Sequence, residues 1–249
     1  MSKVVKHAWW FATRNTNESG AYLDKEFENI NDNSGLCEYV ALSQLMLYNH
    51  LFVDSSLFND EDFNKYIKIN NSDYSLENSS PIFKNLDNLN NVEYTRQSLT
   101  YQLYKATGKQ TDLRTSNYYW KASNLILKSK NKNWKMHGKY GGYWRTWNNI
   151  NHGIPSILGV YPSNFEVWPP HAYLMYGYDD DTDMFLGSFC WGSSETNTAL
   201  YSYYNGAFGS YYFTITGERK NKELKKLFSY KNKKYTGEEI TKMIEQKEK

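Results

Sequence analysis

The chain changes character near residue 139, and this change restricts the folds open to it. Before that point, apolar residues recur at helical spacing between polar stretches, most clearly over residues 37–52, which contain no Gly or Pro. Beyond it, they form short β-branched or aromatic runs bounded by Gly, Pro and Asp, a pattern that predicts strands. Helices followed by strands are typical of the α+β class, in which the strands form an antiparallel sheet.

The pattern gives a residue range for each expected element. We predict helices over residues 37–52, 96–106 and 117–130. We predict strands over residues 153–162, 171–180, 183–192 and 209–215. Residues 15–35 and the Asn-rich residues 70–91 are expected to be loops.

Composition and charge exclude several classes of protein. The 249 residues include 23 Tyr, 12 Phe and 8 Trp, which is far too aromatic for a disordered chain. The net charge of +2 supplies no overall field that would attract nucleic acid, so we expect no nucleic-acid partner. No run approaches the roughly 20 apolar residues that cross a bilayer, so we expect no membrane span.

The first residues bear on the compartment. The segment from Met1 to Phe11 has no apolar core of signal-peptide length. We therefore expect a soluble monomer, which is secreted or at the cell surface if a leader was removed and cytoplasmic otherwise.

Residues 217–249 differ in charge from the rest of the chain. They contain eleven Lys or Arg against six Asp or Glu, a local net charge of +5. Thr236 and Glu239 have the spacing of a capping box before the segment ITKMIEQ, which predicts a short C-terminal helix. We interpret these residues as a basic accessory tail.

Cys37 is the most informative residue of the chain. Asn33 or Ser34 is a suitable N-cap for the helix over residues 37–52, which would place Cys37 in the first turn. There, the positive end of the helix dipole and unpaired backbone N–H groups favour the reactive thiolate. A lone cysteine is more commonly a small buried residue, and this is our reading of Cys190 within a predicted strand. Position alone therefore leaves both readings of Cys37 open.

A cysteine nucleophile needs a base that is distant in sequence but adjacent in space. His50 lies several turns from Cys37 on the same predicted helix and cannot easily reach its sulfur. Three further histidines, His7, His137 and His152, are expected in loop-like polar contexts. His171 follows Trp168-Pro169-Pro170 and opens a predicted strand, which can fix an imidazole at the edge of a sheet.

The order of these motifs resembles papain-like cysteine peptidases. It comprises Gly35-Leu36-Cys37 with its helix, Gly153-x-Pro155, His171-Ala172, Gly177-Tyr178-Asp179 and Trp191-Gly192. The resemblance is to the bacterial streptopain branch, to the bacteriocin-processing branch, and to cysteine peptidases of mycoplasmas and related bacteria. It implies a papain-like domain over residues 1–216, with a helical lobe at about 9–138 that bears the cysteine and a β lobe at 139–216 that bears the histidine. Residues 217–249 lie outside it.

The resemblance also implies further site residues. In this family, a polar side chain before the nucleophile completes the oxyanion hole; here Asn31 stands where Gln is common, and Asn33 is a competitor. The place of the Asn or Asp that orients the imidazole holds neither, and Ser188 is nearest, which favours a Cys/His dyad. Trp191 would shield the pair from water, and Gly35 and Trp191 would lie against the substrate.

These residues predict a cysteine peptidase in which Cys37 and His171 cleave a peptide or protein substrate through a thioester. No metal or organic cofactor is expected, because the chain has no HExxH, no CxxC and no Gly-rich phosphate loop. Two alternatives stay open: an acyltransferase or amidase that shares the thioester chemistry, and an inactive papain-like domain that serves as a binding module.

Overall fold

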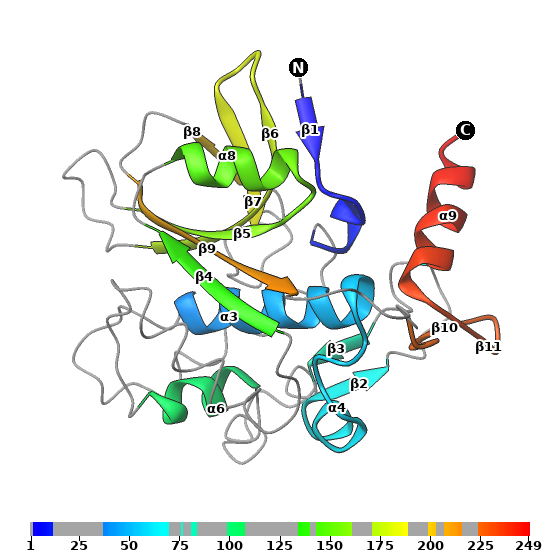
Figure 1. Cartoon of the computed structure of the whole chain (residues 1–249). Helices are drawn as coiled ribbons and strands as arrows, with labels where there is room; N and C mark the ends of the chain where they lie inside the picture. Colours follow the sequence, from blue (N-terminus) through cyan, green and yellow to red (C-terminus); the bar gives the residue numbers. More distant parts are fainter. Residues whose placement is uncertain are drawn as a thin grey trace, which may run out of the picture.

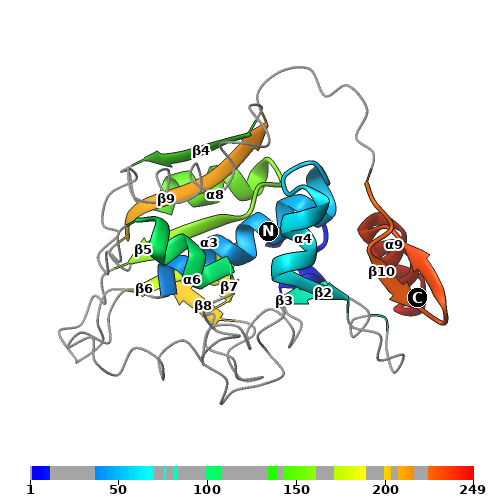
Figure 2. The same cartoon turned by 90° about the horizontal axis from the view of Figure 1, so that it is seen from below.

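The computed structural model describes residues 2–11, 37–69, 76, 81–83, 99–107, 134–139, 143–160, 171–188, 199–202, 207–215 and 224–249. Within these ranges the protein is a mixed structure of helices and antiparallel sheets, so the α+β expectation is confirmed. Figures 1 and 2 show one large sheet between helices, with the C-terminal residues beside it.

Seven of the described strands form the large antiparallel sheet, in the order β4-β9-β5-β6-β7-β8, with β1 paired to β6 next to the beginning of β5. Their bounds are β1 Ser2–Val4, β4 Trp134–Lys139, β5 Ser156–Val160, β6 His171–Asp179, β7 Met184–Ser188, β8 Ala199–Ser202 and β9 Ala207–Ile215. Two small hairpins lie outside this sheet: β2 Ile67–Ile69 with β3 Pro81–Phe83, and β10 Phe228–Tyr230 with β11 Lys233–Tyr235.

The longest of the described helices are α3, which crosses the centre of the molecule, and α9. Their bounds are η1 Ala8–Trp10, α3 Cys37–Tyr48, the π-helix η2 Asn49–Val53, α4 Asp60–Tyr66, α6 Leu99–Ala106, α8 Tyr143–Asn151 and α9 Gly237–Lys247. None of the described helices is long and apolar enough to cross a membrane.

Most of the expected elements in the described ranges are confirmed, although their bounds differ by a few residues. The strand over residues 171–180 is β6, and the capping box of the C-terminal helix is present, with Thr236 and Glu239 bonded reciprocally. The first helix differs from the prediction, because its α-helical part ends at Tyr48 and continues as η2. The expected helix over residues 117–130 lies outside the described residues.

Helices cover both faces of the large sheet. In Figure 1, α3 lies below the sheet and α8 above it. Every residue of α3 from Glu38 to Tyr48 is buried, because the helix is enclosed by β6, β5 and β9 on one side and by α6 on the other. This burial on all sides explains why apolar residues predominate in α3.

The N-terminal segment, residues 2–11, and the C-terminal module, residues 224–249, meet at the end of α3. The backbone N–H of Val5 donates to Tyr176 of β6 at 2.8 Å, which joins the segment to the sheet. The indole N–H of Trp9 donates to the Thr241 hydroxyl of α9 at 2.9 Å, and Lys6 pairs with Glu238 at 2.7 Å. The described part of the predicted accessory tail is therefore a folded hairpin and helix that packs on the domain.

Candidate active site

Cys37 is the first residue of α3, so the predicted place of this cysteine in the first turn of a helix is confirmed. The first backbone N–H groups of an α-helix have no partner within the helix, and with the helix dipole they stabilise negative charge. The end of α3 that begins at Cys37 is thus electrostatically suited to a thiolate.

His171 is the first residue of β6, which confirms that this histidine opens a strand. Its Cα is paired with Val160, the last residue of β5. β6 is an inner strand of the sheet, with β5 and β7 at its sides, so the backbone at its beginning is held by a hydrogen-bonded neighbour. A strand in this position places its first residue at a defined edge of the sheet.

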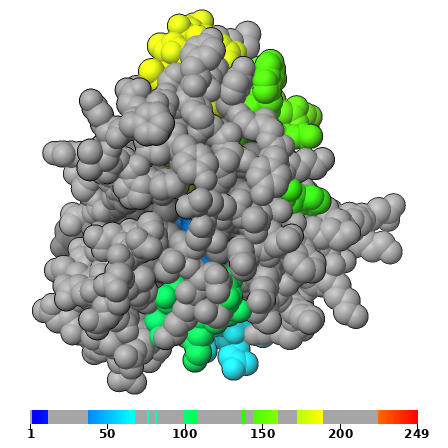
Figure 3. Space-filling view, turned by 90° about the vertical axis from the view of Figure 1, so that its left-hand side faces the viewer, coloured from blue at the N-terminus to red at the C-terminus, as the bar shows by residue number. Residues whose placement is uncertain are grey.

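The beginnings of α3 and β6 lie at the same side of the molecule. β9 is antiparallel to β5, and β5 is antiparallel to β6, so β6 runs in the direction of β9. In Figures 1 and 2, α3 and β9 both begin on the left, and β6, which contacts α3, starts from the same end of the sheet before it rises into the β6–β7 hairpin at the top of Figure 1. Figure 3 looks onto the side where they begin and shows blue atoms of α3 between the yellow β6–β7 hairpin and the green α6.

Contacts at the far end of α3 give a common reference point from which distances along α3 and β6 can be measured. The Phe11 ring stacks on Tyr48, at 4.7 Å between ring centroids, and on Tyr176 of β6, at 5.3 Å. From Tyr48 back to Cys37, the helix rises about 16 Å. From Tyr176 back to His171, the strand also spans about 16 Å. Measured along their own elements, Cys37 and His171 are therefore at similar distances from the shared Phe11 contact.

Ser188 is the last residue of β7, and its side chain is fully buried. Its Cα is paired with Leu174, the fourth residue of β6, so it lies about 10 Å along the strand direction from His171. The orienting role assigned to Ser188 stays a prediction, and the geometry favours a small effect of this residue.

The environment of His50 agrees with its exclusion as the base. It lies in η2, about 20 Å along the helix direction from Cys37, and its ring is buried. Its Nδ1 accepts the backbone N–H of Phe58 at 3.1 Å, and its ring stacks on Phe63. Burial, with the positive charge of Lys225, lowers the pKa of His50 to about 3, so it is neutral at physiological pH.

The three remaining histidines also have other places in the structure. His7 is buried in a tight turn, where its ring stacks on Phe52 and its Nδ1 lies 2.5 Å from the Thr241 hydroxyl. His152 is exposed after α8, with its Nδ1 2.7 Å from the carbonyl oxygen of Asn148. The expectation of a loop was wrong for His137, which lies within β4 and faces Tyr212 across the ladder. Alternating Lys and apolar residues around it form a strand pattern that was overlooked.

Glu38 is a residue of this site that sequence analysis missed. It directly follows Cys37 in the first turn of α3, where negative charge is stabilised by the helix dipole, and only 8% of it is exposed. Its signal was available, because it is the one charged residue between positions 37 and 53. Because an ionised carboxylate opposes thiolate formation nearby, a thiolate at Cys37 requires that the helix dipole stabilise it more than Glu38 destabilises it.

Asn31, Asn33, Gly35, Cys190 and Trp191 lie outside the described residues, and their assigned roles stay predictions. Within the described ranges, no group of three or more His, Cys, Asp or Glu side chains is placed to hold a metal ion.

Comparison with known proteins adds no family to this picture, because no family model, no curated protein and no solved structure matches the chain.

Proposed function

We propose that the protein is a cysteine peptidase with a papain-like arrangement, in which Cys37 is the nucleophile and His171 its base. The observation that carries the proposal is that two chain positions 134 residues apart, at the head of a buried helix and at the head of a strand that contacts it, lie on the same side of the molecule and at similar distances along their elements from the Phe11 contact. A nucleophilic cysteine requires this kind of pairing with a distant histidine.

The proposed reaction uses the chemistry of each residue in order. The Cys37 thiolate attacks the carbonyl carbon of the scissile peptide bond, and the backbone N–H of Cys37 with the Asn31 amide stabilises the negative oxygen. The carbon–nitrogen bond then breaks, and the His171 imidazolium gives its proton to the leaving amine. Water, deprotonated by the neutral His171, attacks the thioester carbon; the carbon–sulfur bond then breaks, which releases the acid and restores the Cys37 thiolate beside the His171 imidazolium for the next cycle.

The pH dependence of thiol alkylation tests the proposed pair. In a Cys190→Ser background only Cys37 can be alkylated, and its reaction with iodoacetamide can be followed by mass spectrometry. A thiolate paired with imidazolium reacts quickly at pH 5 to 6, whereas an ordinary thiol with a pKa of about 8.5 does not. We expect fast alkylation at acid pH and its loss in His171→Ala.

His152→Ala is the matched control, because His152 is exposed and lies in the turn after α8. This variant should keep the alkylation profile of the parent protein. Cys37 alkylation that rises only near pH 8.5 in the parent would refute the ion pair. Fast alkylation without hydrolysis of a casein substrate would instead favour the acyltransferase or the inactive binding module, which share the fold but not the reaction.

A further inference from the structure

The β10–β11 hairpin concentrates positive charge. The eleven residues from Lys225 to Tyr235 contain five lysines and no Asp or Glu. All five side chains are exposed: Lys225, Lys226, Lys231, Lys233 and Lys234. The charge of the C-terminal residues is therefore gathered at one end of the C-terminal module, whereas its acidic residues follow the hairpin: Glu238, Glu239 and Glu245 in α9, and Glu248 directly after it.

This hairpin is held rigidly against the domain. Phe228 of β10 is fully buried, with its ring 5.8 Å from Phe52 and 6.3 Å from Trp9. Directly after β11, the Thr236 capping box begins α9, which is bonded in turn to Trp9. The lysines are thus presented from a fixed scaffold, unlike those of a flexible basic tail.

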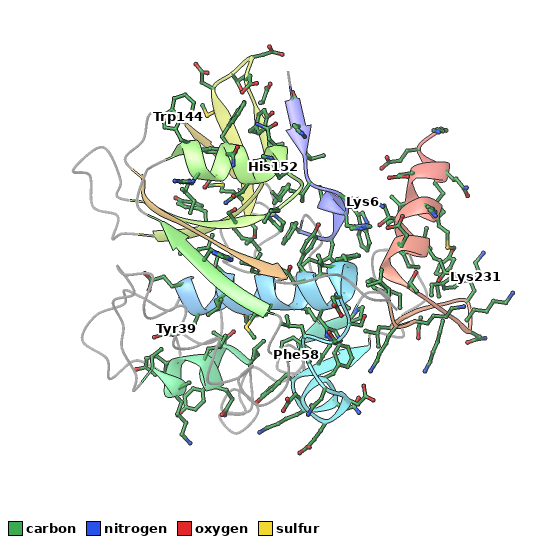
Figure 4. All side chains as sticks on the ribbon, viewed as in Figure 1. Lys6, Tyr39, Phe58, Trp144, His152 and Lys231 are labelled. Carbon is green, nitrogen blue, oxygen red and sulfur yellow. The ribbon has the colours of Figure 1, made fainter. Side chains whose placement is uncertain are left out.

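The turn of the hairpin holds a lysine where another residue would be more stable. Lys231 and Asn232 link the two strands with φ angles of 46° and 61°, as in a type I′ turn. Asn, Asp and Gly are favoured at both positions, because other residues with a β-carbon are strained at positive φ. Figure 4 shows Lys231 at the tip, directed away from the domain. A strained residue that places a charge at an exposed tip points to a use for that charge.

The charges at the tip are also not neutralised by the protein. Among the described residues, Lys231, Lys233 and Lys234 form no ion pair, whereas Lys225 pairs with Asp60 and Lys6 and Lys242 lie at Glu238. Lys231 approaches only the ring of Tyr230, at 5.4 Å. These three lysines are available to an external anion.

We propose that the β10–β11 hairpin docks the protein on an anionic membrane surface by attraction to lipid head groups. The described part of the module has lysines and no arginine, which suits diffuse attraction to a plane of charge better than the bidentate phosphate contacts of nucleic-acid binding. Large exposed apolar residues of the described chain are limited to Val4 and Trp144, outside this module, so the contact is electrostatic without insertion.

The position of the hairpin is compatible with an enzyme that works while docked. In Figures 1 and 2, the hairpin lies at the side of the molecule opposite to the beginnings of α3 and β6. A membrane bound at the hairpin therefore leaves the side of Cys37 and His171 facing away from the lipid. This inference does not depend on peptidase activity, since binding is measured without turnover.

Co-sedimentation of the full chain with vesicles tests the docking. We expect binding to vesicles of phosphatidylcholine mixed with phosphatidylserine, little binding to phosphatidylcholine alone, and loss of binding at high salt. Each surface lysine contributes about fivefold to such partitioning, so Lys233→Gln with Lys234→Gln should weaken it by on the order of 25-fold.

A double variant elsewhere provides the matched control. Lys65→Gln with Lys105→Gln removes the same net charge from exposed positions of α4 and α6 and should leave most of the binding intact. Equal losses in the two double variants would overturn the proposal, because net charge rather than the hairpin would then control binding. The proposal is equally overturned if the wild-type protein fails to prefer the anionic vesicles, or if it binds duplex RNA at physiological salt but not the vesicles.

Discussion

The two ends of α3 differ in what surrounds them. At its last turn and in η2, aromatic rings from three parts of the chain meet: Phe11 stacks on Tyr48, His7 stacks on Phe52, and Phe228 packs against Phe52. The Tyr48 hydroxyl also donates to the carbonyl oxygen of Lys6 at 2.6 Å. The opposite end begins at Cys37, on the side of the molecule where β6 also begins, and its first backbone N–H groups have no acceptor within the helix.

We infer from this difference that the two ends of α3 have different roles. The far end ties the N-terminal segment and the C-terminal module to the core, and so fixes the helix in position. The near end carries the proposed chemistry. Changes at the two ends should therefore separate activity from stability, and the predictions below use that separation.

The largest expected effect is at the near end. Cys37→Ala should abolish hydrolysis altogether, because the nucleophile is removed, while the melting temperature changes little. Turnover of a casein substrate and thermal melting measure the two quantities. Cys190→Ser serves as the control and should keep most of the activity. Activity that survives in Cys37→Ala and disappears in Cys190→Ser would show that the nucleophile was assigned to the wrong cysteine.

At the far end, Phe52→Ala should lower the stability of the protein and leave the reactivity of Cys37 unchanged. Phe52 is 5% exposed and is enclosed by His7, Trp9, Phe228 and Gly237, so truncating it leaves a cavity that costs about 3–5 kcal/mol. The melting temperature should fall by on the order of 10 °C, with the acid-pH alkylation of Cys37 preserved. Trp144→Ala is the matched control. Because Trp144 is 65% exposed, this variant should have the melting temperature of the wild type. If the alkylation profile also changed in Phe52→Ala, the two ends would be coupled.

Asn31 tests the oxyanion site at the near end. Removal of one oxyanion donor lowers the rate by on the order of 10² to 10³, so Asn31→Ala should lose that much turnover while alkylation of Cys37 persists. Asn33→Ala should mainly lose stability, about 1 kcal/mol if it caps the helix. Steady-state kinetics and thermal melts on both variants separate these roles. The reverse pattern would assign the oxyanion donor to Asn33.

The stability of the folded protein depends on pH through His50, at the far end of α3. Because the pKa of His50 is lowered to about 3 in the folded protein and is about 6.5 in the unfolded chain, only the unfolded chain gains a proton as the pH falls below 6.5. The folded state therefore loses about 1.4 kcal/mol per pH unit, or about 2 kcal/mol at pH 5.

The variant His50→Asn isolates this contribution. The Asn side-chain oxygen can replace Nδ1 as the acceptor of the Phe58 N–H, and it does not titrate. Urea unfolding at pH 7 and pH 5 should show that the wild-type protein loses about 2 kcal/mol more than the variant. Other titrating groups cancel in the difference. Parallel losses in both proteins would mean that His50 takes up its proton in the folded state.

The sequence predicted the elements that carry the proposed chemistry better than the ones that hold them. α3 was found because apolar residues recur at helical spacing with no Gly or Pro, and β6 because it is bounded by Pro170 and by the run Asp179-Asp180-Asp181. Their alignment could not be predicted, since it depends on Phe11, which joins Tyr48 to Tyr176 across more than a hundred residues. The hydrophobic periodicity of a short sequence segment does not report contacts between residues that are far apart in the chain.

Elements with weak local patterns were missed for the same reason. β1 is three exposed residues that become a strand only because β6 offers an open edge beyond β5. The β10–β11 hairpin was interpreted as part of a basic tail, although Phe228, Tyr230 and Tyr235 alternate around its lysines. Its fold is set by the packing of Phe228 on Phe52 and Trp9, which no window of the sequence shows.

The smallest expected effect concerns Ser188, whose register with Leu174 keeps it about 10 Å along the strand from His171. Ser188→Ala should lower kcat/KM by less than tenfold and leave the acid-pH alkylation of Cys37 unchanged. Ser156→Ala is the matched control, since it removes another fully buried serine hydroxyl, bonded to Asn149 at 2.9 Å, and should cost stability but not rate. A hundredfold loss in Ser188→Ala, together with loss of acid-pH alkylation, would instead make this hydroxyl the group that orients the imidazole, because only an orienting contact affects both measurements at once.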